Sequence, residues 1–193
     1  MSSVVISGDT SGAITVSAPA VAGTNTLTLQ AATATSSVNT LGTAVASTSG
    51  TSIDFTSLPS WIKRITVMFQ GVSTNGSSII QVQLGTGSTT YTTTGYVGGA
   101  WTANTTNASS TTGMPLTGGG AGAGARVFAG TMTISTLGSN NWASSVTVFD
   151  TQGAASMGGS SIALAAVLTA VRITTVNGTD TFDAGSVNIL YEG

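Results

Sequence analysis

Alternation between apolar and polar residues is clearest in the middle of the chain. Every second residue is apolar between positions 65 and 69, and the same period returns between 80 and 84, where glutamines stand between the apolar residues. A period of two places successive side chains on opposite faces of a β-strand. Asn75 and Gly76 lie between the two runs, and Asn-Gly is typical of a tight two-residue turn. The pattern therefore predicts two strands joined as a β-hairpin.

The second half of the chain predicts further strands. Short apolar or alternating segments follow one another at 126–137, 142–150, 161–168, 170–176 and 186–191. Turn sequences rich in Gly, Asn and Ser separate several of them, including 138–141 and 177–180. The run at 161–168 also suits a helix, because periodicity does not distinguish the two in a short apolar run. We predict a strand there.

The region between Gly85 and Gly124 has a weaker pattern. Its few apolar residues stand among Thr, Asn and Gly, and it ends in a glycine-rich run at 118–124. We predict a strand near 89–96, followed by a long loop. The glycine-rich run contains no Lys and precedes no helix, so it does not match a phosphate-binding loop. A flexible loop or a close approach of two backbones is the expected use of these glycines.

Residues 1–46 differ from the rest of the chain. Three short runs, at 4–6, 13–16 and 27–29, are separated by turn-rich sequences, and a linker of small residues follows them. A segment with so few large side chains cannot build its own core, so it needs another surface to lie on. The sequence therefore indicates an N-terminal arm that serves for attachment and a body at 47–193.

Composition favours an all-β fold. The 26 glycines, 26 serines and 36 threonines make up close to half of the 193 residues. These residue types disfavour long helices but are compatible with strands and turns. Strands that recur at short intervals without a helical period indicate an antiparallel β-sandwich. The number of strands favours a jelly-roll-like arrangement over an immunoglobulin-like one.

Charged and reactive side chains are scarce, which excludes several functions. Only 5% of the residues are charged, the net charge is −2, and the chain has no Cys and no His. Thiol and imidazole nucleophiles, Ser-His-Asp triads and disulfides are therefore excluded, and we expect no cofactor and no metal. Four basic residues cannot follow a phosphate backbone, so we expect no nucleic-acid partner. No apolar run is long enough to span a bilayer, and no secretory signal is recognisable.

Asn177, Asp180 and Asp183 form the one acidic cluster, with Glu192 as a further candidate member. Three oxygen-bearing side chains within seven residues suit a calcium ion. The same residues also commonly shape β-turns, and we prefer that interpretation because the spacing matches no calcium loop. Asp180 and Asp183 match the paired carboxylates of a glycosidase only loosely.

Lys63 and Arg64 stand at the start of a predicted strand, after Trp61. Adjacent residues of a strand point to opposite faces, so only one of the two faces solvent on a half-buried sheet. We expect them to pair with Asp54 or Asp183 at a subunit boundary. The alternative is specific binding of a carboxylate of another protein.

Tyr91, Tyr96 and Trp101 lie in a polar region flanked by glycines. Such aromatic residues resemble the platforms on which sugars stack. The alternative is that they anchor loops, or pack one subunit against another.

Three phrases of the sequence carry a resemblance. Residues 6–29, ISGDTSGAITVSAPAVAGTNTLTL, resemble an opening found in many virion proteins of tailed bacteriophages and prophages, including tail fibres. Residues 52–73 and 171–192 resemble the β-sandwich module that follows this opening. The resemblance implies a non-enzymatic virion component, commonly a homotrimer, with its N-terminal segment as the attachment. It supplies no catalytic residues and does not extend to residues 86–125.

We therefore expect a virion structural protein that is made in the cytoplasm of the bacterial host. The first interpretation is a trimeric tail-fibre or adhesin-type component that docks to other virion proteins by its arm and contacts a host-surface glycan. The second is a capsid decoration, or cement, protein at local three-fold axes, with its arm lying across major capsid proteins. The third is a secreted carbohydrate-binding module that uses Tyr91, Tyr96 and Trp101.

Overall fold

The computed structural model of the chain describes residues 3–7, 13–17, 38–119, 124 and 126–193. The chain divides into two compact units, Met1–Ser36 and Ser37–Gly193, which we call the N-terminal unit and the body. In the N-terminal unit, β1 (Ser3–Ser7) pairs antiparallel with β2 (Ala13–Ser17). Two of the three predicted N-terminal runs are therefore strands, and the third, at 27–29, lies outside the described residues.

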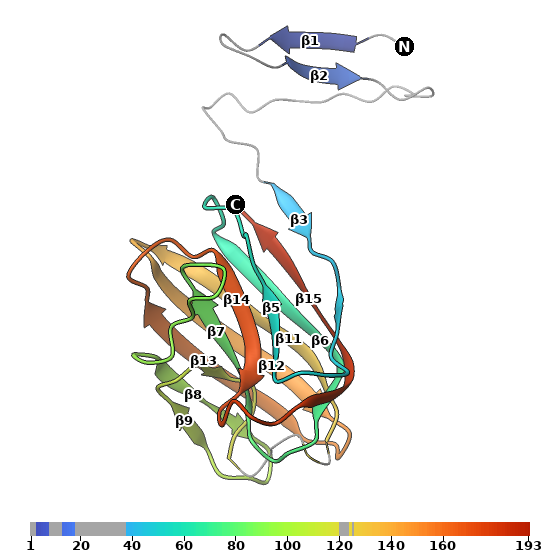
Figure 1. The fold of residues 1–193 in the computed structure, drawn as a ribbon, viewed down its shortest axis with the longest axis vertical. Helices are drawn as coiled ribbons and strands as arrows, with labels where there is room; N and C mark the ends of the chain where they lie inside the picture. The colour runs from blue at the N-terminus through green and yellow to red at the C-terminus, as the bar shows by residue number, and fades with distance from the viewer. Residues whose placement is uncertain (1–2, 8–12, 18–37, 120–123, 125) are drawn as a thin grey trace. The chain divides into compact units, whose positions relative to one another are not determined.

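The body consists of two antiparallel β-sheets packed face to face (Figure 1). The larger sheet has the order β3-β15-β6-β11-β12-β13-β8-β9, with β4 also paired to β15. Its strands are β3 (Asn39–Leu41), β4 (Val45–Ala46), β6 (Arg64–Thr74), β8 (Val97–Thr102), β9 (Ala108–Ser110), β11 (Phe128–Gly138), β12 (Asn141–Asp150), β13 (Ala155–Ala163) and β15 (Phe182–Glu192). The smaller sheet has the order β10-β7-β14-β5, with β5 (Ser52–Phe55), β7 (Ile80–Gly85), β10 (Met114–Pro115) and β14 (Ala170–Thr175).

These two sheets confirm the predicted all-β antiparallel sandwich. Most connections between β5 and β15 cross from one sheet to the other. The core lies between the sheets and is built from alternate positions of their strands. The larger sheet contributes, among others, Ile65, Val67, Phe69, Met132, Ile134 and Ile189, and the smaller sheet contributes Ile53, Val82, Leu84 and Ile173.

The predicted hairpin between β6 and β7 is wrong. β6 pairs with β11 and β15 in the larger sheet, whereas β7 pairs with β14 and β10 in the smaller one. Asn75 does not form a tight turn with Gly76, since neither has the positive φ that such a turn requires. Instead, the backbone N–H of Asn75 donates to the carbonyl oxygen of Thr181. Both strands have an apolar face, and placing them in opposite sheets lets both faces close over one core.

The body begins at Ser37, before the predicted boundary at residue 46. β3 and β4 lie within the segment predicted as an arm, yet both pair with β15. Leu41 is the register partner of Leu190, and Val45 is the partner of Val187. The segment lacks apolar bulk for a core of its own, but its backbone groups find partners along one side of a long strand.

Two further strand predictions need correction. Residues 89–96 contain a single bridge, between Tyr91 and Gly85, and the strand β8 begins at Val97, inside the predicted loop. The strand predicted at 161–168 is β13, which starts at Ala155 and ends at Ala163. Its first half contains two glycines and little apolar bulk, so the sequence pattern did not reveal it. Residues 164–169 form neither strand nor helix.

Candidate functional site

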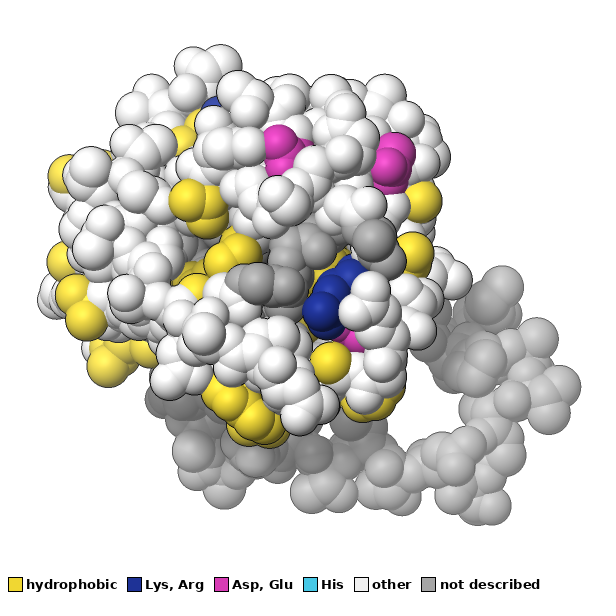
Figure 2. Space-filling view, turned by 90° about the horizontal axis from the view of Figure 1, so that it is seen from below, with side chains coloured by type: hydrophobic (Ala, Val, Ile, Leu, Met, Phe, Trp, Pro, Cys, Tyr) yellow, Lys and Arg dark blue, Asp and Glu magenta, His cyan; other side chains and the backbone are white. Residues whose placement is uncertain are grey.

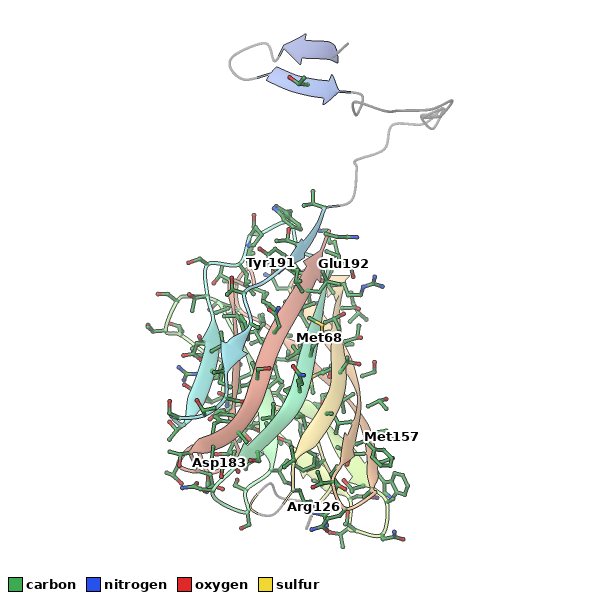
Figure 3. The ribbon with its side chains drawn as sticks, turned by 90° about the vertical axis from the view of Figure 1, so that its right-hand side faces the viewer. Met68, Arg126, Met157, Asp183, Tyr191 and Glu192 are labelled. Atoms are coloured by element: carbon green, nitrogen blue, oxygen red, sulfur yellow. The ribbon has the colours of Figure 1, made fainter. Side chains whose placement is uncertain are left out.

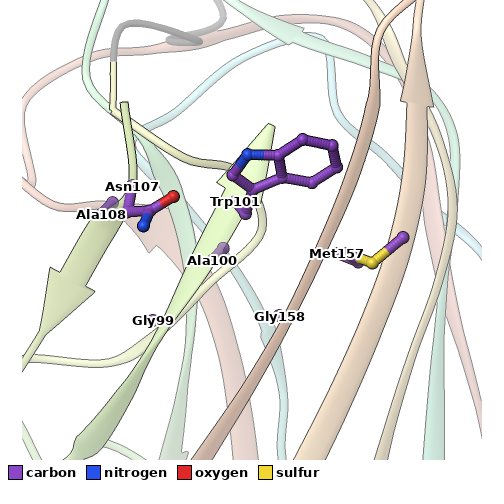
Figure 4. A pocket seen from close by; sticks show the side chains of 7 residues that line it. All are labelled: Gly99, Ala100, Trp101, Asn107, Ala108, Met157 and Gly158. Carbon is purple, nitrogen blue, oxygen red and sulfur yellow. The ribbon is translucent and has the colours of Figure 1, made fainter. Parts of the chain in front are cut away.

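Trp101 lies on the outer face of the larger sheet, beside a hollow. Its neighbours in β8, Ala100 and Thr102, are buried, whereas 43% of Trp101 is exposed. Met157 of β13 is its register partner across the strands and is 51% exposed. The two side chains border a hollow of about 420 Å³ (Figure 4). Its other lining residues are Gly99, Ala100, Asn107, Ala108 and Gly158.

Close packing of strands shapes this hollow. A Cβ at Gly99 would lie 2.3 Å from the carbonyl oxygen of Ala108, and a Cβ at Gly158 would lie 2.4 Å from that of Gly99. The three strands can therefore approach this closely only because glycine occupies these positions. Because the glycines have no side chains, they leave part of the Trp101 ring uncovered. The ring can therefore contact an apolar side chain or a flat ring of a binding partner.

Tyr96 is not part of a surface platform, which corrects its predicted role. Only 1% of the residue is exposed, and its hydroxyl oxygen accepts a hydrogen bond of 2.8 Å from the backbone N–H of Leu84. Burial raises the pKa of the Tyr96 hydroxyl to about 12, against a smaller lowering by the Leu84 hydrogen bond. Tyr96 therefore serves the core and satisfies a backbone donor of β7.

Tyr91 lies beside the smaller sheet, away from Trp101. The guanidinium carbon of Arg172 lies 3.9 Å from the centre of the Tyr91 ring, within the range of a cation–π contact. Arg172 also donates two hydrogen bonds to the carboxylate of Asp54, its register partner in β5. Burial, followed by the nearby Asp54 charge, raises the pKa of the Tyr91 hydroxyl. The three predicted aromatics therefore occupy three different settings.

Arg64 has a different partner from the predicted one. It pairs with the carboxylate of Glu192, its register partner in β15. The hydrogen bond and charge of Arg64 lower the pKa of Glu192. Asp54 pairs with Arg172, and Asp183 accepts from the hydroxyl of Ser73, so neither expected acid contacts Lys63 or Arg64 within the chain. A subunit-boundary role for Lys63 and Arg64 remains a prediction.

The oxygen atoms of Asn177 and Asp180 are used within the turn between β14 and β15. The side-chain oxygen of Asn177 accepts from the Thr175 hydroxyl at 2.7 Å and from the backbone N–H of Thr179 at 3.1 Å. Asp180 accepts from the Asn177 amide at 2.6 Å and from the backbone N–H of Ser78 at 2.9 Å. These contacts match the turn interpretation rather than a calcium site.

Glu192 does not join this cluster. Asp183 and Glu192 lie at opposite ends of β15, as their labels in Figure 3 show. Among the described residues, no three His, Cys, Asp or Glu side chains gather in a group that could hold a metal ion.

Comparison with known proteins gives no relative. No family model, no curated protein and no solved structure matches the chain. In the part of the chain that the structure describes, no helix is long and apolar enough to cross a membrane. The surfaces of the body therefore provide the structural evidence on function.

Sequence reasoning missed the neighbours of Trp101. Met157, on the adjacent strand β13, and Phe149, on β12 one strand further along the sheet, are both more than half exposed. Met157 is 56 positions from Trp101 in the sequence, and only the register of β13 against β8 brings the two together. No sequence pattern alone could have predicted this grouping, because it depends on the order of the strands in the sheet.

Proposed function

We propose that this chain is a non-enzymatic structural protein of a bacteriophage particle, a homotrimeric tail-fibre or adhesin-type component attached through its N-terminal unit. The three phrases at 6–29, 52–73 and 171–192 support this proposal by their resemblance to phage virion proteins. The all-β sandwich of the body agrees with the module that this resemblance implies.

The observation that carries the proposal is a broad surface without charge. We call it the outer face, and define it as a set of fifteen outward-facing residues from β8, β11, β12 and β13. Its members are small, hydroxyl-bearing or apolar, and none is charged: Val97, Gly99, Trp101, Ala129, Thr131, Thr133, Ser135, Ala143, Ser145, Thr147, Phe149, Ala155, Met157, Gly159 and Ser161. Charged side chains are also few on the end of the body seen in Figure 2.

Such a face is suited to contact with another protein surface. Large hydrophobic residues that gather on a surface mark interaction sites, and the centres of protein interfaces are depleted in charge. Val97, Trp101, Phe149 and Met157 are the exposed large hydrophobics of the outer face. The hydroxyl-bearing residues around them can exchange their hydrogen bonds to water for hydrogen bonds to polar groups of a partner. Burying them in an interface therefore costs little free energy. In a closed trimer, each copy would use this face in the same way.

The use of the carboxylates also supports a non-enzymatic role. In the part of the chain that the structure describes, every carboxylate has a partner within the chain, and none pairs with a second acid across a cleft. These acids are Asp54, Asp150, Asp180, Asp183 and Glu192. Glycoside hydrolysis requires two carboxylates that face one reacting bond.

The first prediction tests the outer face. Met157→Lys places a charge at the centre of the proposed interface, where it would lose its hydration, so we expect the trimer to dissociate into monomers. Light scattering coupled to size-exclusion chromatography measures the molar mass. Val167→Lys is the matched control, since Val167 is 46% exposed on the 164–169 segment, and it should remain trimeric. A wild-type protein with the mass of a monomer would contradict the proposal.

The second prediction concerns attachment. Deletion of residues 1–36 removes the N-terminal unit and leaves the body with β3 and β4 in place, so we expect a folded body that no longer enters phage particles. Circular dichroism measures folding, and immunoblotting of purified particles measures incorporation. Normal incorporation of the shortened chain would refute the attachment role.

The position of the full chain on the particle separates the two virion interpretations. Immunogold labelling of particles that carry the tagged wild-type chain should mark the tail of a phage. Labelling of the head would instead identify a decoration protein.

A further inference from the structure

A polar pocket lies on the outward side of the smaller sheet, whereas Trp101 belongs to the larger sheet. Its volume is about 310 Å³, at the small end of the range for ligand pockets. Alternate residues of β7 and β14 form its floor, because the residues between them face the core. The lining residues that matter for binding are Gln81, Gln83, Thr112, Arg172, Thr174 and Val176.

Two glutamines on this floor are buried but only half satisfied. Gln81 is 1% exposed and Gln83 is 6% exposed. The Gln81 amide oxygen accepts from the Thr112 hydroxyl at 3.1 Å, and the Gln83 amide nitrogen donates to the Thr112 carbonyl oxygen at 2.9 Å. The other polar atom of each amide has no hydrogen-bond partner among the described residues. Neither atom is among the fully buried unpaired side-chain atoms of the described residues, so both reach the pocket, where water or a ligand can complete their hydrogen bonds.

The pocket has no net charge. Arg172 is the one charged residue in its lining, and its Nε and Nη2 donate to the two Asp54 oxygens at 2.7 Å and 2.8 Å. The Tyr91 ring lies against the same guanidinium group and helps to fix its position. The remaining N–H groups of Arg172 can donate to a ligand, but the charge is already balanced. An anion would therefore gain little from this site, and a neutral ligand fits it better.

We infer that this pocket binds a neutral saccharide through a pair of adjacent hydroxyl groups. A sugar hydroxyl both donates and accepts, so neighbouring hydroxyls can accept from the free Gln81 amide nitrogen and donate to the free Gln83 amide oxygen. The Thr174 hydroxyl donates to the carbonyl oxygen of Thr51 at 2.9 Å and keeps its lone pairs for a further sugar hydroxyl. Val176, which is partly exposed at the edge, offers an apolar contact to the C–H face of the ring.

Saccharide binding itself does not depend on the proposed virion role. Its use in recognising a host-surface glycan does rest on that proposed function. The two can therefore fail separately: a monomer that binds sugar would overturn the trimer and keep the pocket, and a trimer that binds none would do the reverse.

Saturation-transfer NMR on the full chain tests the site, with glucose, galactose and mannose as neutral probes and glucuronate as the charged probe. We expect a signal from at least one neutral sugar and a weaker signal from glucuronate. Gln83→Leu removes the free amide oxygen at nearly constant volume and should raise the Kd at least tenfold, since a buried polar contact is lost. Gln70→Leu is the matched control on the exposed side of β6 and should bind like the wild type.

A second variant tests the pocket without changing a buried residue. Thr93 is exposed at the rim of the pocket, so Thr93→Trp can block entry without disturbing the fold, which thermal unfolding verifies. Loss of binding in Thr93→Trp and Gln83→Leu supports the site. The inference is overturned if no neutral sugar binds, if both variants bind normally, if glucuronate binds more tightly, or if Trp101→Ala abolishes binding while Thr93→Trp does not.

Discussion

Asp150→Ala is expected to lower the free energy of unfolding by about 3–5 kcal/mol, measured by urea denaturation. The side chain of Asp150 is fully buried and pairs with Arg126, which is itself mostly buried. Asp150 also accepts hydrogen bonds from the backbone N–H groups of Gln152 at 2.9 Å and Ala154 at 3.0 Å. The substitution therefore leaves a buried cation and two backbone donors without their partner. Together these contacts hold the turn between β12 and β13.

Glu192→Ala is the matched control for this result. It also removes a carboxylate that pairs with an arginine, but the Arg64 side chain is 54% exposed. Water can replace the lost contact there, so we expect a much smaller loss of stability. Equal losses in the two variants would contradict the account of Asp150 as a buried anchor.

The same residue gives the stability a defined pH dependence. Burial raises the pKa of Asp150, but the hydrogen bonds from Ala154, Arg126 and Gln152 together outweigh burial, so its pKa lies below its ordinary value of 3.8. The group therefore stabilises the fold fully above its unfolded pKa, and this contribution is lost as the pH falls through the lower folded pKa. The stability difference between wild type and Asp150→Ala should accordingly shrink below a pH of about 4.

Gly185→Ala is expected to lower the free energy of unfolding by more than about 3 kcal/mol. Gly185 lies in a bulge of β15, where the register against β6 shifts, and its φ is +90°. A Cβ there would lie 2.3 Å from the carbonyl oxygen of Gly71 and 2.5 Å from that of Gln70. Both contacts are with backbone of the central strand β6, which cannot move without disturbing its other pairs. Thermal or urea denaturation measures the loss.

Gly153→Ala is the control that measures the cost of backbone strain without a steric overlap. Gly153 has a φ of +81°, but nothing lies within 4 Å of a Cβ built there. We expect it to cost about 1–3 kcal/mol from strain alone. If Gly185→Ala lowered the free energy of unfolding no more than Gly153→Ala does, the close approach of β6 and β15 would not contribute to the cost of the substitution.

Sequence patterns predicted the strands whose signals are local. β11, β12 and β14 lie close to their predicted bounds, because apolar and polar residues alternate along them. The turn after β11 was also predictable, and Ser139 and Asn140 have the positive φ values of 49° and 61°. The Asn75 region failed because the same two-residue signal does not say whether the next strand stays in the sheet or crosses to the other one.

The candidate binding residues were less predictable than the strands. An aromatic residue in a polar segment can point into the core, as Tyr96 does, or out of it, as Trp101 does, and the choice depends on the strand that follows. Arg172 and Asp54 are 118 positions apart and meet only through the register of β14 and β5. Gln81 and Gln83 alternate with apolar residues as on any strand with one solvent-facing side. Their burial under the segment around Thr112 left no trace in that pattern.

The position of β15 between β6 and the pair β3 and β4 affects how the protein is made. Arg64 and its partner Glu192 are 128 residues apart, so β6 leaves the ribosome several seconds or more before β15 has been synthesised. Throughout that interval one edge of β6 has no neighbour, and unpaired strand edges promote aggregation. Production of this chain should therefore depend on chaperones that bind nascent polypeptides, and on a translation rate that does not lengthen this interval.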